Sequence, residues 1–131
     1  MDDKEAAKRT RDTANLYFKG VKNEEKPYGL WQHFDKELAK DMSLYITGRM
    51  YSREKIPHPT RQLVTVAALA VLSRPEELKL HIHAALNVGC TSEEVAEVIF
   101  QTSIYGGVPS ANTALKVLKT VMEERESTEE A

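Results

Sequence analysis

Apolar residues recur at helical spacing along most of the chain, and this periodicity predicts an all-α fold of about six helices. No segment has the strict alternation of apolar and polar residues that is typical of a strand. A weakly apolar helix is predicted over residues 2–20, and residues 21–30 are predicted to form a loop, because they contain Pro27 and Gly29.

A second helix is predicted from Trp31 to Arg49, with Gly48 as its end. Residues 49–60 contain two prolines and are predicted to form an irregular connector. Thr60 is then expected to cap a helix over residues 61–72 that is apolar nearly all round. Such a helix is typical of the centre of a core or of a subunit interface.

Residues 75–112 are predicted to form a packed helical hairpin around which the fold is organised. Ser73 and Glu76 have the spacing of a capping box, and so do Thr91 and Glu94. Gly89 is expected to end the first helix of the hairpin.

The last helix is predicted to start at Pro109 and to be amphipathic. From Glu123 to the end the sequence is acidic, and this tail is expected to fray. The 131 residues are 41% hydrophobic, which is enough for one domain spanning residues 1–131.

Charge and composition exclude several classes of protein. The net charge is −2 and basic residues are interleaved with acidic ones, so no nucleic-acid surface is predicted. No apolar run approaches the roughly 20 residues that span a bilayer, and the N-terminus has no apolar signal segment, so a cytoplasmic location is expected. Cys90 is the single cysteine, which rules out an internal disulfide and a Cys-x-x-Cys redox pair.

The hairpin carries a candidate acid/base pair. Glu77 and His81 are separated by one helical turn and lie beside the apolar stripe, whereas His83 falls on the polar side and is expected to be solvated. By spacing alone, a purely structural pair at a helix boundary is the simpler interpretation. The two histidines diverge on the helix, so no metal site is predicted from them.

A second group of polar residues precedes the apolar helix. The connector over residues 49–60 is rich in cations, among them Arg53, and could form a solvated loop or receive a carboxylate substrate. Arg61 and Thr65 lie on one face of the following helix.

The segment from Arg61 to Leu115 resembles the carboxymuconolactone decarboxylase family, and in particular its members that decarboxylate 4-carboxymuconolactone. The matching positions are Arg61, Leu63, Thr65, Glu76, Glu77, Leu78, Leu80, His81, Ala84, Ala85, Gly89, Glu94, Glu97, Val98, Gln101, Thr102, Tyr105, Gly107, Val108, Pro109, Ala111 and Asn112. Gly48 and Arg53 also match, but Tyr51 replaces a usual tryptophan, Glu54 and Lys55 replace Pro-Gly, and residues 1–30 match poorly.

The resemblance implies an alkyl hydroperoxidase D-like helical domain that assembles through its central hairpin, most commonly as a homohexamer. It implies cofactor-independent decarboxylation of a small carboxylated lactone, as in the conversion of 4-carboxymuconolactone to 3-oxoadipate enol-lactone during aromatic degradation. His81 is then expected to donate the proton and Glu77 to orient it. Arg61 and Arg53 are expected to bind carboxylate, and Thr65 or Tyr105 to add a hydroxyl donor.

Two other functions remain open from the sequence. The altered connector is compatible with a family enzyme that acts on another small lactone or keto acid, and the fold is also compatible with a non-catalytic oligomeric scaffold or binding protein. A thiol peroxidase is disfavoured, because Cys90 has no partner cysteine.

Overall fold

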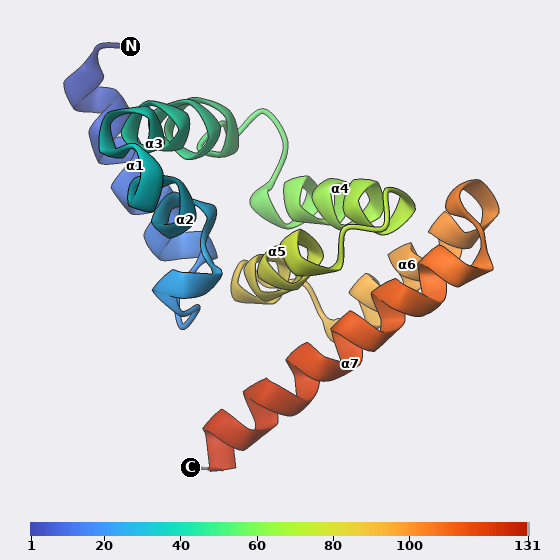
Figure 1. The fold of residues 1–131 in the computed structure, drawn as a ribbon. Helices are drawn as coiled ribbons and strands as arrows, with labels where there is room; N and C mark the ends of the chain where they lie inside the picture. The colour runs from blue at the N-terminus through green and yellow to red at the C-terminus, as the bar shows by residue number, and fades with distance from the viewer. Residues whose placement is uncertain (131) are drawn as a thin grey trace. The chain divides into compact units, whose positions relative to one another are not determined.

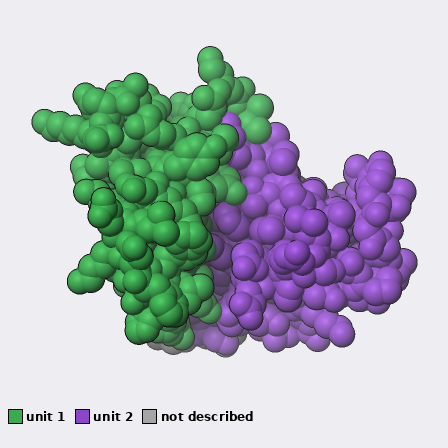
Figure 2. Space-filling view, turned by 45° about the horizontal axis from the view of Figure 1, so that its top comes forward, with its two compact units in different colours: residues 1–57 green, residues 58–131 purple. Residues whose placement is uncertain are grey.

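The computed structural model describes residues 1–130, and over this range it contains helices and no strand (Figure 1). The all-α prediction is confirmed, with seven α-helices among the described residues where about six are expected. The chain packs as two compact units, one formed by residues 1–57 and the other starting at His58 (Figure 2). The single-domain assignment stays a prediction, since a compact unit need not fold independently.

The first unit contains three α-helices and two other helical segments. They are α1 (Asp3–Tyr17), the 3-10 helix η1 (Asn23–Glu25), α2 (Pro27–Phe34), α3 (Lys36–Ser43) and the π-helix η2 (Leu44–Tyr51). The loop predicted over residues 21–30 therefore holds η1 and the beginning of α2, because Pro27 is well placed in the first turn of a helix.

Asp35 divides the helix that the sequence predicts from Trp31 to Arg49. Its backbone is extended, with φ −155° and ψ 106°, and its carboxylate accepts a hydrogen bond of 2.9 Å from the backbone N–H of Leu38. Aspartate is a favoured N-cap residue, so this position ends α2 and starts α3. The prediction of one continuous helix is wrong at this residue.

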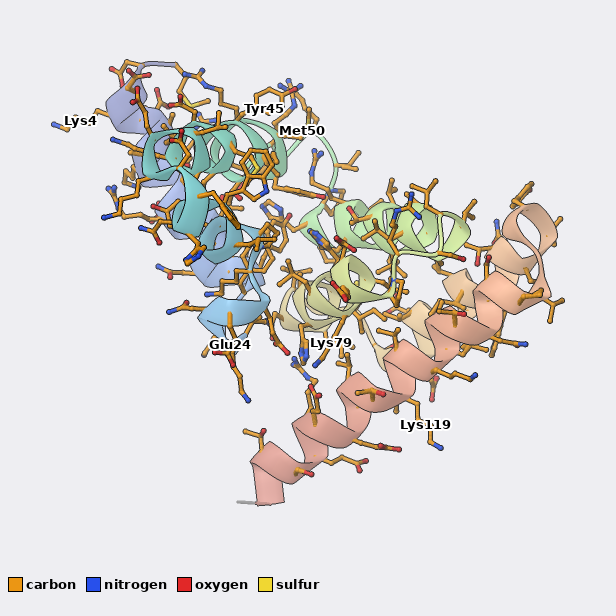
Figure 3. The ribbon with its side chains drawn as sticks, viewed as in Figure 1. Lys4, Glu24, Tyr45, Met50, Lys79 and Lys119 are labelled. Atoms are coloured by element: carbon orange, nitrogen blue, oxygen red, sulfur yellow. The ribbon has the colours of Figure 1, made fainter. Side chains whose placement is uncertain are left out.

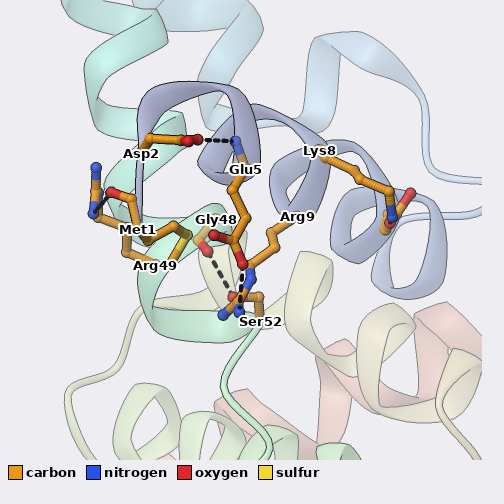
Figure 4. A network of polar contacts seen from close by, with 9 residues as sticks. Met1, Asp2, Glu5, Lys8, Arg9, Gly48, Arg49 and Ser52 are labelled. Atoms are coloured by element: carbon orange, nitrogen blue, oxygen red, sulfur yellow. Dashed lines mark hydrogen bonds and ion pairs between the residues drawn. The ribbon is translucent and has the colours of Figure 1, made fainter.

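Gly48 is a packing position inside η2 and does not end the helix, contrary to the prediction. Gly48 is buried, and a side chain there would collide with the Thr10 hydroxyl and lie 2.7 Å from the carbonyl oxygen of Ala6. The missing side chain therefore allows η2 to pack closely on α1. Figure 4 shows the polar contacts around this junction, among them the 2.6 Å hydrogen bond from Ser52 Oγ to the Gly48 carbonyl.

The second unit is a group of four helices around one apolar core. They are α4 (His58–Val71), α5 (Pro75–Asn87), α6 (Ser92–Gly106) and α7 (Val108–Glu130). The core is built from aliphatic side chains of all four helices, chiefly Val66, Ala70, Leu78, Ile82, Val95, Ile99, Ala114, Leu118 and Val121. None of the described helices is both long enough and apolar enough to cross a membrane.

Helix α4 begins at His58, so the predicted cap at Thr60 lies inside its first turn. Its buried face is formed by Gln62, Val66 and Ala70 at intervals of four residues, whereas Val64 is 60% exposed. Helix α4 is apolar on nearly all sides but buries only one face, so some of its apolar side chains lie on the surface of a single chain.

The two predicted capping boxes have different outcomes. The box of Thr91 and Glu94 is present, with reciprocal hydrogen bonds of 3.0 and 2.9 Å, and confirms the predicted start of α6. The box at Ser73 is absent, because Ser73 adopts a φ of +53° and its hydroxyl lies 2.7 Å from that of Ser110. Arg74 takes the cap position of α5 instead.

The acidic segment from Glu123 continues α7 as far as Glu130, where the sequence predicts fraying. Contacts with α5 explain the difference. Lys79 projects from α5 (labelled in Figure 3). Its Nζ lies 3.0 Å from Glu124 Oε1, and Arg125 Nη2 donates a 3.2 Å hydrogen bond to Asn87 Oδ1. Tertiary partners therefore hold a segment whose composition alone favours disorder.

Candidate active site

The centre of the candidate site is a hydrogen bond between two helices. His81 Nδ1 on α5 lies 3.0 Å from Gln62 Oε1 on α4, although the two residues are 19 positions apart in the sequence. Gln62 is fully buried, and its amide nitrogen has no hydrogen-bond partner in the described part of the chain. Since an amide oxygen only accepts, His81 Nδ1–H is the donor of this hydrogen bond and Nε2 is the unprotonated ring nitrogen of the neutral imidazole.

Burial determines the charge of His81. Desolvation of the ring lowers the pKa of His81 from 6.5 to about 4, and the nearby negative charge of Glu77 raises it only in part. The imidazole is therefore neutral near pH 7 in the substrate-free protein.

This shift predicts a dependence of stability on pH. The unfolded chain has a histidine of ordinary pKa, so as the pH falls below 6.5 the unfolded state takes up a proton before the folded state does. Stability that is present above pH 6.5 should be lost toward pH 4, by up to about 3 kcal/mol. Urea unfolding at several pH values should show this loss in the wild type and a smaller loss in His81→Gln. If the free energy of unfolding fell equally with pH in the two proteins, the lowered pKa of His81 would be contradicted.

Glu77 lies one turn before His81 on α5 and is exposed. The hydrogen bond at His81 Nδ1 goes to Gln62, so Glu77 acts on the imidazole through its charge. The hydrogen-bond partner of His81 at Nδ1 is therefore Gln62, and the orienting role expected for Glu77 stays a prediction.

Arg61 precedes Gln62 and is partly buried, and its Nε is a buried donor without a hydrogen-bond partner among the described residues. A buried guanidinium N–H is costly unless an acceptor meets it, and a carboxylate is one acceptor that would do so. The Thr65 hydroxyl donates a 3.2 Å hydrogen bond to the Arg61 carbonyl, one turn back on the same helix. Arg61 and Gln62 thus lie near the N-terminal end of α4, and Thr65 lies one turn further along the helix.

Tyr105 is not brought to that end of α4. Gly106 packs against the backbone of Val71, which is nine residues or roughly 13 Å along α4 from Gln62, and the neighbouring Tyr105 is 75% exposed. Arg53 belongs to the first unit. There it lines an open pocket of about 600 Å³ together with Arg9, Asp12, Ser52, Glu54 and Lys55.

His83 is not the solvated residue that the helical periodicity predicts. Its side chain is only 12% exposed, because α7 covers it. Arg125 Nη1 lies 3.3 Å from His83 Nδ1, and Glu124 Oε2 lies 3.7 Å from His83 Nε2. The polar side of α5 is therefore an interface with α7, and His83 contributes to packing between these helices.

Cys90 is buried, and its thiol donates a 3.4 Å hydrogen bond to the Pro59 carbonyl. Burial, and next the charge of Glu94, raise the pKa of the Cys90 thiol, which therefore stays protonated and weakly nucleophilic. No group of three or more metal-ligating side chains lies together among the residues that the structure describes.

Gln62 is the residue that sequence reasoning missed. A signal was available, because Gln62 shares the i, i+4, i+8 register of Val66 and Ala70 and is therefore a polar residue on the buried face of an apolar helix. Buried polar side chains require a hydrogen-bond partner, so a glutamine on the buried face of an apolar helix is a candidate site residue.

Comparisons with known proteins find one family model and two relatives. Residues 36–120 match the model of the carboxymuconolactone decarboxylase family. Over 91 residues the chain is 35% identical to the 4-carboxymuconolactone decarboxylase of Acinetobacter baylyi, with 70% of this chain and 68% of that protein covered. It is also 33% identical over 106 residues to an uncharacterized 15.0 kDa protein from the nqo9-nqo10 intergenic region of Paracoccus denitrificans, with 72% of this chain and 78% of that protein covered.

Proposed function

The chain belongs to the carboxymuconolactone decarboxylase family, and we propose that it is a cofactor-independent carboxy-lyase that converts 4-carboxymuconolactone to 3-oxoadipate enol-lactone. The similarity to the Acinetobacter baylyi enzyme supports the reaction class. The observation that carries the proposal is the buried, unpartnered Nε–H of Arg61 on α4, the helix whose Gln62 side chain is hydrogen-bonded to the neutral His81.

The reaction needs little from the protein besides binding and one proton. The bond to the departing carboxylate breaks, and its electron pair passes through the conjugated double bond into the lactone carbonyl. Carbon dioxide and a dienolate result, so the substrate serves as its own electron sink. Arg61 binds a carboxylate through its guanidinium group, whose planar fork suits two carboxylate oxygens. Arg53 is proposed as a second cation, and Thr65 or Tyr105 as a hydroxyl donor to the developing oxyanion.

His81 must gain a proton before it can donate one. A neutral imidazole is a very weak acid, whereas an imidazolium can protonate carbon. An anionic substrate placed beside the ring favours the charged form of His81 and offsets part of the desolvation. We therefore propose that His81 takes up a proton from solvent when the substrate binds and returns it to the dienolate carbon. Glu77, whose charge also favours the imidazolium, assists this uptake.

The direct test is turnover of 4-carboxymuconolactone, followed by ultraviolet absorbance, with the product identified by mass spectrometry. Turnover that depends on His81 supports the proposal. Binding of the lactone without turnover would indicate a binding protein with the family fold, and no binding of carboxylated lactones at all would overturn the proposed function.

The segment around Tyr51 supports one alternative substrate class. Tyr51 stands at a position where the decarboxylases it resembles usually carry tryptophan, and its ring packs edge-on against Tyr17 at 5.9 Å. Glu54 and Lys55, at positions where the resemblance implies Pro-Gly, line the pocket that contains Arg53. These differences favour a family enzyme that acts on another small lactone or keto acid, which a panel of carboxylated lactones would distinguish.

Activity is expected to be independent of the thiol. Cys90→Ser should retain turnover within about twofold, because the protonated thiol only donates to the Pro59 carbonyl and a serine hydroxyl can do the same. Turnover should likewise survive a chelator. The measurement is the steady-state rate of the wild type with and without chelator beside that of Cys90→Ser. Loss of activity in a well-folded variant, or on chelation, would contradict a thiol-independent and cofactor-independent reaction.

An exposed apolar patch supports the proposal that the protein is a homo-oligomer, with a hexamer as the expected state. The C-terminal ends of α4 and α6 meet where Gly106 contacts Val71. Around this contact, large apolar side chains are exposed. They are Val71, Leu72, Ile104, Tyr105 and Val108, which we call the α4–α6 patch. A second copy of the chain is the occupant that the family's assembly suggests, and its contact would remove these side chains from water.

A charge in the α4–α6 patch should therefore disrupt assembly. Ile104, which is 76% exposed, contributes little to the monomer core, so Ile104→Asp is expected to lower the molar mass measured by light scattering while preserving the helical content. Lys116→Asp, an exposed change on α7, is the matched control and should leave the molar mass unchanged. A wild type that is already monomeric near 15 kDa would refute the oligomer.

A further inference from the structure

Burying the side-chain amide of Gln62 costs free energy, and helix packing alone does not explain why a polar residue stands at this position. The residue is fully buried between helices, its Oε1 meets His81 Nδ1 at 3.0 Å, and its Nε2 has no partner in the described chain. A methionine would fill similar space without leaving a buried polar atom unused. A buried polar group that is only half satisfied indicates a role other than packing.

We propose that Gln62 is the positioning residue of the site, holding His81 as the Nδ1–H tautomer so that Nε2 alone exchanges the catalytic proton. This inference rests on the proposed decarboxylase function for its chemical consequence, but the tautomer itself can be measured without substrate.

The geometry supports this assignment in two ways. Gln62 reaches the ring from α4, so the hydrogen bond is anchored in a different helix from the histidine and restricts the rotation of the imidazole. Glu77 and His81, in contrast, both lie on α5, and Glu77 is exposed. A buried amide loses less of its hydrogen-bond strength to competing water than an exposed carboxylate does.

The proton balance then follows from the tautomer. Nδ1 keeps its hydrogen throughout, because Gln62 Oε1 accepts it. The proton taken up with the anionic substrate binds to the lone pair of Nε2. When the dienolate forms, the Nε2–H bond breaks, the electron pair of the dienolate forms the new C–H bond, and His81 returns to the neutral Nδ1–H form. No oxidant, reductant or second proton donor is needed.

The test combines a spectroscopic readout with kinetics. Long-range proton–nitrogen correlation spectra of the substrate-free wild type, near pH 7, should show His81 protonated at Nδ1. Gln62→Met should shift the ring toward a mixture of tautomers and lower kcat by about tenfold, with KM little changed. Gln62→Glu should restore the Nδ1–H form, because a carboxylate also accepts from Nδ1. Gln32→Met, at an exposed position of α2, is the matched control.

The outcomes separate this inference from the proposed function. A wild-type protein that turns over the lactone but carries its His81 proton on Nε2 would overturn the role of Gln62 and leave the decarboxylase intact. A protein without turnover whose His81 is Nδ1-protonated, and loses that state in Gln62→Met, would support the positioning role and refute the reaction. If Gln62→Met fails to fold, the nitrogen that carries the His81 proton in the wild-type spectrum supports or contradicts the positioning role by itself.

Discussion

His81→Gln is expected to lower kcat by about 10²–10⁴-fold while substrate binding and assembly are preserved. The physical reason is that the proposed reaction separates binding from proton transfer. In that proposal guanidinium groups bind the carboxylate, and the proton is returned only after carbon dioxide has formed. Glutamine keeps a polar side chain of similar size opposite Gln62 but cannot carry a transferable proton near neutral pH. The measurement is steady-state turnover together with equilibrium binding of the lactone.

The choice of control for this variant depends on the structure. His83→Gln is unsuitable, because His83 contacts Arg125 and Glu124 and its replacement would disturb the α5–α7 interface. His33→Gln is a better control, since His33 is exposed on α2 and its ring contacts the adjacent Phe34. Equal rates for His81→Gln, His33→Gln and the wild type would show that His81 has only a structural role.

Arg61→Lys is expected to raise KM by about tenfold or more with a smaller effect on kcat. The buried Nε–H of Arg61 has no partner within the described chain, and lysine has no equivalent donor at that position along its side chain. Hydrogen bonds to charged groups contribute about 1.5–3 kcal/mol, which corresponds to at least a tenfold change in affinity. Kinetics over a wide range of lactone concentration would separate the two constants.

Arg74→Lys is the matched control for this substitution. Arg74 occupies the N-cap position of α5 and donates a 2.7 Å hydrogen bond to the Leu72 carbonyl, so it lies at the opposite end of α4 from Arg61. Its replacement should leave KM unchanged. If both arginine variants raised KM equally, the effect would not be specific to Arg61 and a carboxylate bound there would be contradicted.

The sequence by itself determined the features that depend on neighbouring residues along the chain. Apolar spacing identified an all-α fold, and the Thr91–Glu94 box located the start of α6. These signals act over one helical turn, so they can be read without knowing what packs against the helix. The same local reasoning identified His81 as a candidate, because its position beside an apolar stripe is a property of α5 alone.

Only the tertiary structure decided the partners of these residues. The bond between Gln62 and His81 joins positions 19 residues apart, and the burial of His83 depends on α7, more than 40 residues away. Glu77, one turn from His81, was the natural choice from spacing, yet the buried amide of α4 occupies Nδ1. Helical periodicity defines which side of a helix a residue lies on, but the neighbour it meets depends on how helices cross and pack, and that packing is a property of the whole unit.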